Sequence, residues 1–157
     1  MLVLVDTGIL LRLLDPTDPA HATITAAVLA LRARGDEPVT APQIIAEFWN
    51  VCTRPATARG GLGLDVAETD RRVRIIEGTI PLLGEHPSAY SLWRSLVVTL
   101  AVLGKQVHDA RLAAQMQAHA ITHILTLNGS DFTRYPGITP IDPANLIVPP
   151  PPPPSVP

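Results

Sequence analysis

The chain has 157 residues, 46 % of them hydrophobic, which is enough for one domain with an apolar core and short for two. Its 12 basic and 14 acidic residues give a formal net charge of −2, so bulk charge does not indicate a nucleic-acid-binding protein. The single cysteine, Cys52, excludes an intrachain disulfide and a thiol-based zinc site, and no stretch is long and apolar enough for a signal peptide or a membrane span, so we expect a cytoplasmic protein with no membrane contact.

The first half of the chain alternates short apolar runs with helical patterns. Leu2–Val5 is a continuous apolar run, which is typical of a strand buried on both faces in a parallel sheet. Proline and glycine residues mark the ends of the helices that follow, and Pro42 suits the first turn of the third helix. The expected elements, in chain order, are a strand over 2–5, helices over 7–14 and 19–34, a strand at 39–40 and a helix over 42–53.

The second half, after a glycine-rich loop at 60–63, continues this alternation. Strands that alternate with helices predict a three-layer α/β/α sandwich around a central, mostly parallel sheet. We expect this domain to span residues 1–146 and a disordered proline-rich tail to occupy 147–157, because a polyproline run cannot join a packed core. The expected elements are a helix over 65–77, a strand over 80–83, helices over 89–103 and 109–119, and strands over 123–127 and 139–141.

Three aspartates share one position relative to the predicted elements. Asp6 follows the first strand, Asp109 opens a late helix, and Asp131 lies just beyond the strand that ends near Leu127. Ligands of open α/β sheets bind outside the carboxyl ends of the strands, so these three side chains can face one crevice. Glu47 lies on the apolar face of its own helix, where an unpaired charge is costly, and can reach the same crevice.

Four carboxylates at one crevice indicate a site for a divalent cation. Mg²⁺ prefers carboxylate and water oxygens, and such an ion polarises a phosphoryl oxygen and supplies hydroxide during phosphodiester hydrolysis. Each acid also has an ordinary structural explanation: Asp6 and Asp109 as helix N-caps, Asp131 as a turn residue, and Glu47 as the partner of Arg54. We expect the metal site because all four acids fall where one site can collect them, and no Ser–His or Cys–His pair competes with them.

Three segments resemble the PIN domains of VapC toxins, which act in type II toxin–antitoxin systems. They are LVDTGILLRLL, APQIIAEFWNVCTRP and VHDARLAAQMQAHAITHILTLNGSDFTRYPGI, and the likeness extends from about residue 2 to residue 142. The resemblance implies a small α/β/α fold and Mg²⁺- or Mn²⁺-dependent endoribonuclease activity on RNA. It also implies a homodimer and a cognate VapB-like antitoxin that blocks the site.

The resemblance also implies roles for individual residues. Asp6, Glu47 and Asp109 match the acids that bind metal and catalyse cleavage in the family. The fourth acid of the family falls where this chain has either Asn128 or Asp131, and because only Asp131 is acidic, we assign the role to it.

Other positions are expected to support the site or to depart from the family. Thr126 matches a hydroxyl residue beside the site, and with Asn128 it is expected to support the acids. Gly8 stands where the family usually has a polar side chain, and its neighbour Thr7 is expected to point in another direction. Arg54 and Arg59, just after the helix of Glu47, are candidates for contacts with RNA phosphates.

Two other functions stay open from the sequence. The triplet Asp6-Thr7-Gly8 also occurs in aspartic proteases, where two such aspartates share a proton, but there it belongs to an all-β chain. The second alternative is a PIN domain that has lost catalysis and binds RNA or a protein, which Gly8 and Asn128 favour. Binding of a divalent metal separates this alternative from an active nuclease.

Overall fold

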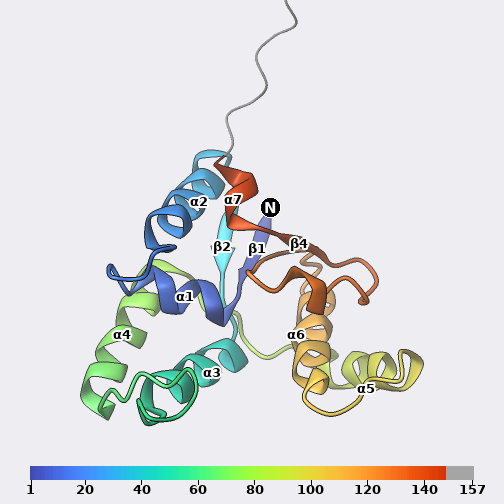
Figure 1. Ribbon diagram of the computed structural model, residues 1–157. Coiled ribbons are helices and arrows are strands. Elements are labelled where there is room, and N and C mark those ends of the chain that lie inside the picture. Colours follow the sequence, from blue (N-terminus) through green and yellow to red (C-terminus); the bar gives the residue numbers. More distant parts are fainter. Residues whose placement is uncertain (148–157) are drawn as a thin grey trace, which may run out of the picture.

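A computed structural model describes residues 1–147, and the predicted proline-rich tail lies, from residue 148 onward, outside them. Figure 1 shows the helices gathered on the two sides of a central sheet. No helix of the described part is both long and apolar enough to cross a membrane. The elements follow in the order β1 (Leu2–Val5), α1 (Thr7–Leu13), α2 (His21–Ala33), β2 (Glu37–Val39), α3 (Pro42–Thr53), α4 (Val66–Thr79), α5 (Ala89–Thr99), α6 (Gln106–Ala118), β3 (His123–Leu125), η1 (Gly129–Asp131), β4 (Thr139–Ile141) and α7 (Pro143–Leu146).

The four strands form one parallel sheet in the order β2-β1-β3-β4. Strand β1 lies inside this sheet, and its residues Val3, Leu4 and Val5 are fully buried, as an apolar run flanked by helices requires. In Figure 1, α1 to α4 lie to the left of β1, and α5 and α6 lie to its right. The expected α/β/α architecture with a parallel central sheet is therefore confirmed.

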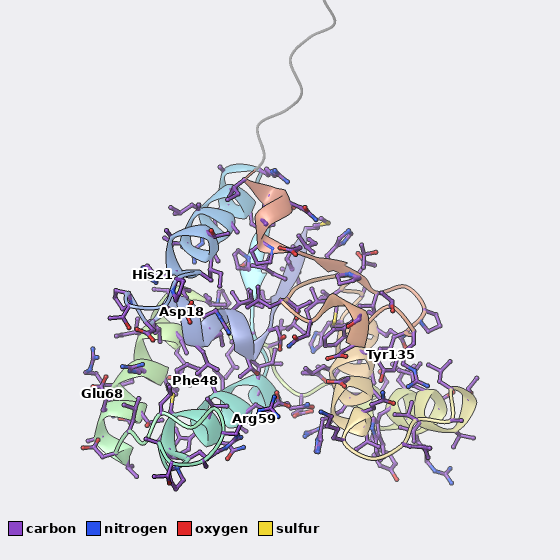
Figure 2. The ribbon with its side chains drawn as sticks, in the orientation of Figure 1. Asp18, His21, Phe48, Arg59, Glu68 and Tyr135 are labelled. Carbon is purple, nitrogen blue, oxygen red and sulfur yellow. The ribbon has the colours of Figure 1, made fainter. Side chains whose placement is uncertain are left out.

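Two helices that begin next to strand ends bring acidic residues to one edge of the sheet. Helix α1 starts directly after β1, because the side chain of Asp6 accepts a hydrogen bond from the backbone N–H of Thr7 and so caps the helix. Helix α3 starts with Pro42 and buries Ile44, Phe48 and Cys52. Figure 2 shows Phe48 between α3 and the neighbouring helices. The adjacent Glu47 reaches the start of α1, where the Thr7 hydroxyl donates to it.

Several predicted elements differ from the observed ones. The strand expected over 80–83 is wrong: this segment forms a single parallel bridge between Thr40 and Leu82, since Pro81 has no N–H to donate and Leu82 is exposed. Helix α5 ends at Thr99 rather than at residue 103, and Ala101 then takes a left-handed φ of 48°. Strand β3 ends at Leu125, two residues earlier than expected.

Thr40, at the end of β2, gives a test of the packing. Its side chain is fully buried, and the hydroxyl has no hydrogen-bond partner within residues 1–147. Because valine has nearly the same shape and no polar atom, Thr40→Val should raise the free energy of unfolding by about 1 kcal/mol in urea titrations. Thr69→Val is the matched control: Thr69 is equally buried, but its hydroxyl donates to the Asp65 carbonyl at 2.8 Å, so its loss should destabilise. A Thr40→Val protein less stable than the wild type would contradict this account of the buried hydroxyl.

Candidate active site

Asp6 is held at the carboxyl end of β1 by hydrogen bonds to both of its carboxylate oxygens. The Thr7 N–H donates to Oδ1 at 2.7 Å, and the Thr126 hydroxyl donates to Oδ2 at 2.7 Å. The side chain is 8 % exposed, and this burial raises the pKa of Asp6; the two hydrogen bonds lower it, and the charges of Glu47 and Asp131 raise it further. Asp6 is thus a buried carboxylate with a fixed orientation.

Thr126, directly after β3, aims its hydroxyl proton at Asp6. Its own oxygen accepts a hydrogen bond from the backbone N–H of Asn128 at 3.0 Å, which leaves the hydroxyl hydrogen for the Asp6 carboxylate. Thr126 is 2 % exposed, whereas the side chain of Asn128 is exposed. Asn128 therefore contributes to this hydrogen-bond chain through its backbone.

Glu47 lies half-buried on α3, and both of its oxygens also accept hydrogen bonds. The Thr7 hydroxyl donates to Oε2 at 3.1 Å, and the Gln43 amide donates to Oε1 at 2.8 Å. The expectation that Thr7 points elsewhere was wrong: its N–H binds Asp6 and its hydroxyl binds Glu47. Arg54 is not the partner of Glu47, since its guanidinium donates to the Arg59 carbonyl at 3.1 Å.

Asp109 lies in the first turn of α6 and is not its cap. The helix begins at Gln106, three residues before the predicted start, so the ordinary explanation of Asp109 as an N-cap fails. Its half-buried side chain makes no hydrogen bond or ion pair with any other described residue. Burial, followed by the negative charges of Asp131, Glu47 and Asp6, raises the pKa of Asp109 to about 6.

Asp131 completes the group from the short helix η1, where its side chain is exposed. Its charge raises the pKa of both Asp6 and Asp109, so it lies within electrostatic range of both. The charges of Glu47 and Asp131 thus reach both Asp6 and Asp109, although the four acids come from four separate segments of the chain.

The donor chemistry of this cluster fits a hard divalent cation such as Mg²⁺ or Mn²⁺. All four candidate ligands are carboxylates, and the mutual repulsion that raises the pKa of Asp109 is relieved by a positive ion. Across residues 1–147, no three His, Cys, Asp or Glu side chains stand close enough together to share an ion in the present arrangement. The side chains of Asp109 and Asp131 accept no hydrogen bond from described residues, so their oxygens are free to bind a cation.

Three further positions bear on the acids: Gly8, which has no side chain, and two arginines, Arg54 and Arg59. A Cβ added at Gly8 would meet nothing closer than the Arg12 guanidinium at 3.7 Å, so the missing polar side chain reflects the residue type and not a lack of space. Arg59 is exposed in the loop after α3, and in the view of Figure 2 it lies over the space between α3 and α6. Arg54 supports that loop by binding the Arg59 carbonyl.

Three residues that contact this region were missed from the sequence. Thr7 and Gln43 donate to Glu47, and Tyr135 donates from its buried hydroxyl to the carbonyl of Gln106 at 3.2 Å, where α6 begins. Figure 2 shows Tyr135 beside α6. The i, i+4 spacing of Gln43 and Glu47 was a usable signal for one of these contacts, whereas nothing in the sequence singled out Tyr135.

Comparison with protein-family models places this chain in a known family. The family model of the PIN domain matches residues 3–138, and the chain therefore belongs to the PIN-domain family. No curated protein sequence matches this chain. The aspartic-protease alternative is excluded, because a parallel sheet flanked by helices is not the all-β chain that the Asp6-Thr7-Gly8 triplet requires there.

Solved structures of toxin–antitoxin systems share the fold at low sequence identity. VapBC-1 of nontypeable Haemophilus influenzae has a TM-score of 0.67 at 15 % identity, covering 91 % of this chain and 98 % of the other. VapBC2 of Rickettsia felis, bound to a DNA fragment from its promoter, has a TM-score of 0.66 at 12 % identity, covering 90 % and 98 %. The Mycobacterium tuberculosis toxin VapC20, which cleaves the sarcin-ricin loop, has a TM-score of 0.53 at 18 % identity, covering 78 % and 86 %.

The raised pKa of Asp109 predicts how the metal-free protein responds to pH. The pKa is about 6 in the folded state against an ordinary value of 3.8, so the folded state holds this proton more tightly than the unfolded chain does. The folded protein should therefore lose stability as pH rises from about 4 to above 6. Asp109→Asn removes the repelled charge, so in EDTA it should melt at a higher temperature than the wild type at pH 7.5, and at about the same temperature at pH 4.

Thermal unfolding in EDTA across this pH range checks the prediction. Asp131→Asn should also raise the melting temperature at pH 7.5, but by less than Asp109→Asn. The charge of Asp131 is one cause of the raised Asp109 pKa, and burial is a larger one. Equal melting temperatures for Asp109→Asn and the wild type at both ends of the range would show that the cluster exerts no repulsion on Asp109.

Proposed function

We propose that the protein is a divalent-metal-dependent endoribonuclease and the toxin component of a VapBC-type module. The observation that carries the proposal is the position of Asp6 at the carboxyl end of β1, where the Thr7 hydrogen bonds link it to Glu47, within electrostatic range of Asp109 and Asp131, in a chain that belongs to the PIN-domain family. The fold shared with the toxin–antitoxin structures supports the same class of protein.

In this proposal the four acids hold Mg²⁺ or Mn²⁺, and the protein's own hydrogen bonds keep two of them in place. When bound, such an ion polarises the scissile phosphate and makes a water molecule more acidic. Thr126 and the Thr7 N–H orient Asp6, while the Thr7 hydroxyl orients Glu47. Because four carboxylates repel a phosphodiester, the RNA backbone approaches them only when their charge is compensated.

Arg59 is the best-placed candidate for an RNA phosphate contact outside the acids. It is exposed in the loop that follows α3, the helix of Glu47, and a guanidinium can bind a phosphate through two hydrogen bonds. Arg54, whose guanidinium is directed to the Arg59 carbonyl, supports the loop that carries this contact. RNA as the substrate class is supported by the fold shared with VapC20, a toxin that cleaves the sarcin-ricin loop.

Metal-dependent cleavage tests the proposal directly. The wild type should bind Mn²⁺ and cleave RNA in the presence of Mg²⁺ or Mn²⁺. This cleavage should stop when EDTA removes the metal. Asp6→Asn should reduce the cleavage rate by about 100-fold or more, because it removes one ligand charge from the site. Asp65→Asn is the matched control, since Asp65 caps α4 away from the cluster and asparagine also caps helices well. Cleavage that persists in EDTA, or in Asp6→Asn, would refute this mechanism.

A PIN domain that binds RNA or a protein without cleaving is the second candidate function. Two observations favour it: Gly8 lacks the polar side chain found in the family, and no three potential ligands of the described chain share an ion as they stand. The Mn²⁺ titration separates the two candidates, because the binding module requires no divalent metal. A folded wild type that binds no Mn²⁺ would support this second function.

The partners proposed with this function are a VapB-like antitoxin and a second copy of the chain. The structures from Haemophilus influenzae and Rickettsia felis are VapBC complexes, and their fold likeness to this chain supports such a pairing. An inhibitor that inserts a basic side chain among the four acids would neutralise the charges that the metal needs.

Co-expression tests the proposed partners. A small open reading frame directly upstream, which encodes a DNA-binding N-terminus, should restore growth that the toxin alone arrests, and its product should co-purify with the chain. Light scattering on the purified complex should give a mass with two copies of this chain. Growth arrest that the upstream product does not relieve would contradict the pairing.

A further inference from the structure

Gln43 lies buried in the first turn of α3, between two helices that each carry an acid of the cluster. A primary amide has two N–H donors, and here each binds a different helix. The Nε2 atom donates to Oε1 of Glu47 at 2.8 Å and to the backbone carbonyl of His108 at 3.0 Å. His108 directly precedes Asp109, so one amide joins the side chain of one acid to the backbone beside another.

The bridge matters because α3 and α6 have little else between them. Helix α3 packs on α1 and α4, while α6 packs on α5, and the two helices themselves make few contacts. Among the hydrogen bonds of the described residues, the bond from Gln43 to His108 is the one that joins α3 to α6. The separation of Glu47 and Asp109 is therefore not fixed by helix packing alone.

The amide of Gln43 is only partly satisfied by hydrogen bonds. The Gln43 side chain is 9 % exposed, and its oxygen Oε1 is buried without a hydrogen-bond partner in residues 1–147. A buried acceptor without a donor is unfavourable, and an apolar side chain of similar length would remove it. The N–H donors are the feature of Gln43 that an apolar residue cannot supply.

We infer that Gln43 is a positioning residue that sets the orientation of Glu47 and its distance from Asp109, and so tunes the affinity of the site for a divalent cation. This inference rests on the proposed metal-dependent function. Groups that hydrogen-bond to metal ligands fix the ligand orientation, and their loss typically lowers metal affinity or activity about 10- to 100-fold. Gln43 acts through Glu47 and does not itself contact the ion or the RNA.

Gln43→Met is the test, because methionine keeps the length and packing of the side chain and removes both donors. Mn²⁺ binding is measured on the full chain by electron paramagnetic resonance of the free ion, and cleavage on a fluorophore–quencher RNA hairpin. We expect Mn²⁺ to bind about 10-fold more weakly and kcat to fall, while KM for the RNA stays within about twofold. The melting temperature in EDTA should change little, because the loss of the two donated hydrogen bonds is offset by the removal of the unpartnered oxygen.

Gln115→Met is the matched control. Gln115 is also a buried glutamine, but its amide donates to the carbonyl of Gly84 at 2.7 Å, away from the acids, so its replacement should leave Mn²⁺ affinity and kcat unchanged. Gln43→Asn is a second variant: it keeps the amide but is one methylene too short to reach both partners, so Mn²⁺ should also bind more weakly if Gln43→Met does not fold.

The outcomes separate the inference from the function on which it rests. A folded Gln43→Met protein that binds Mn²⁺ and turns over as the wild type does would overturn the positioning role and leave the nuclease intact. An equal loss of Mn²⁺ affinity in Gln115→Met would also overturn it, because the effect would then not depend on Glu47. A wild type that binds no Mn²⁺ would instead overturn the proposed function, and the inference with it.

Discussion

Burial of carboxylates at the carboxyl ends of the strands, together with the repulsion between these groups, is the constraint around which the candidate site is built. Asp6 is buried at the end of a central strand, and Glu47, Asp109 and Asp131 lie within electrostatic range of it. Burial removes water that would screen these charges, so the pKa of Asp6 and of Asp109 rises. A fold optimised for stability alone would not collect four acids in this way, which is why the cluster indicates a function that needs negative charge.

The parallel sheet determines where the acids meet. Strands β1 and β3 are hydrogen-bonded neighbours and run in the same direction, so the residues that follow them, Asp6 and Thr126, emerge at the same edge. Helices α3 and α6 then bring Glu47 and Asp109 to this edge from residues far apart in the chain. Because sheet topology fixes Asp6 and helix packing controls the other two, the least constrained distance is the one between α3 and α6.

The sequence predicted most of the fold, because the order of the elements depends on patterns that are local in the chain; the role of the four acids stays a prediction. Runs of apolar residues and helix-ending prolines and glycines gave the α/β order, and the acids fall at predicted element ends. The prediction of a strand over 80–83 was wrong. The apolar residues of this segment fit a strand, but Pro81 and the exposure of Leu82 reduce its pairing to one bridge. The predicted start of α6 was wrong because the N-cap residue, Lys105, makes no side-chain hydrogen bond to the helix. The sequence therefore has no typical capping residue at this position.

The polar donors around the acids were harder to predict, because their roles depend on contacts across the chain. Thr126 was expected beside the site only through family resemblance, and its bond to Asp6 joins residues 120 positions apart. Thr7 was assigned the wrong direction, because alternation along a strand does not apply where a helix begins: its N–H and its hydroxyl serve two different acids. Such pairings arise from the tertiary fold and leave no local pattern.

The distribution of the basic residues bears on how a chain of net charge −2 would bind the RNA substrate proposed above. Most arginines are engaged in the fold: Arg71, Arg72, Arg74 and Arg111 pair with acids, for example. In the part of the chain that the structure describes, the side chains of Arg59, Arg94 and Lys105 make no hydrogen bond or ion pair. Long-range attraction of RNA should therefore be weak, and in the proposed function the affinity for RNA depends on a few local contacts and on the cation that compensates the acids. That function would make the metal act on RNA binding as well as on chemistry, so it couples substrate affinity to metal affinity.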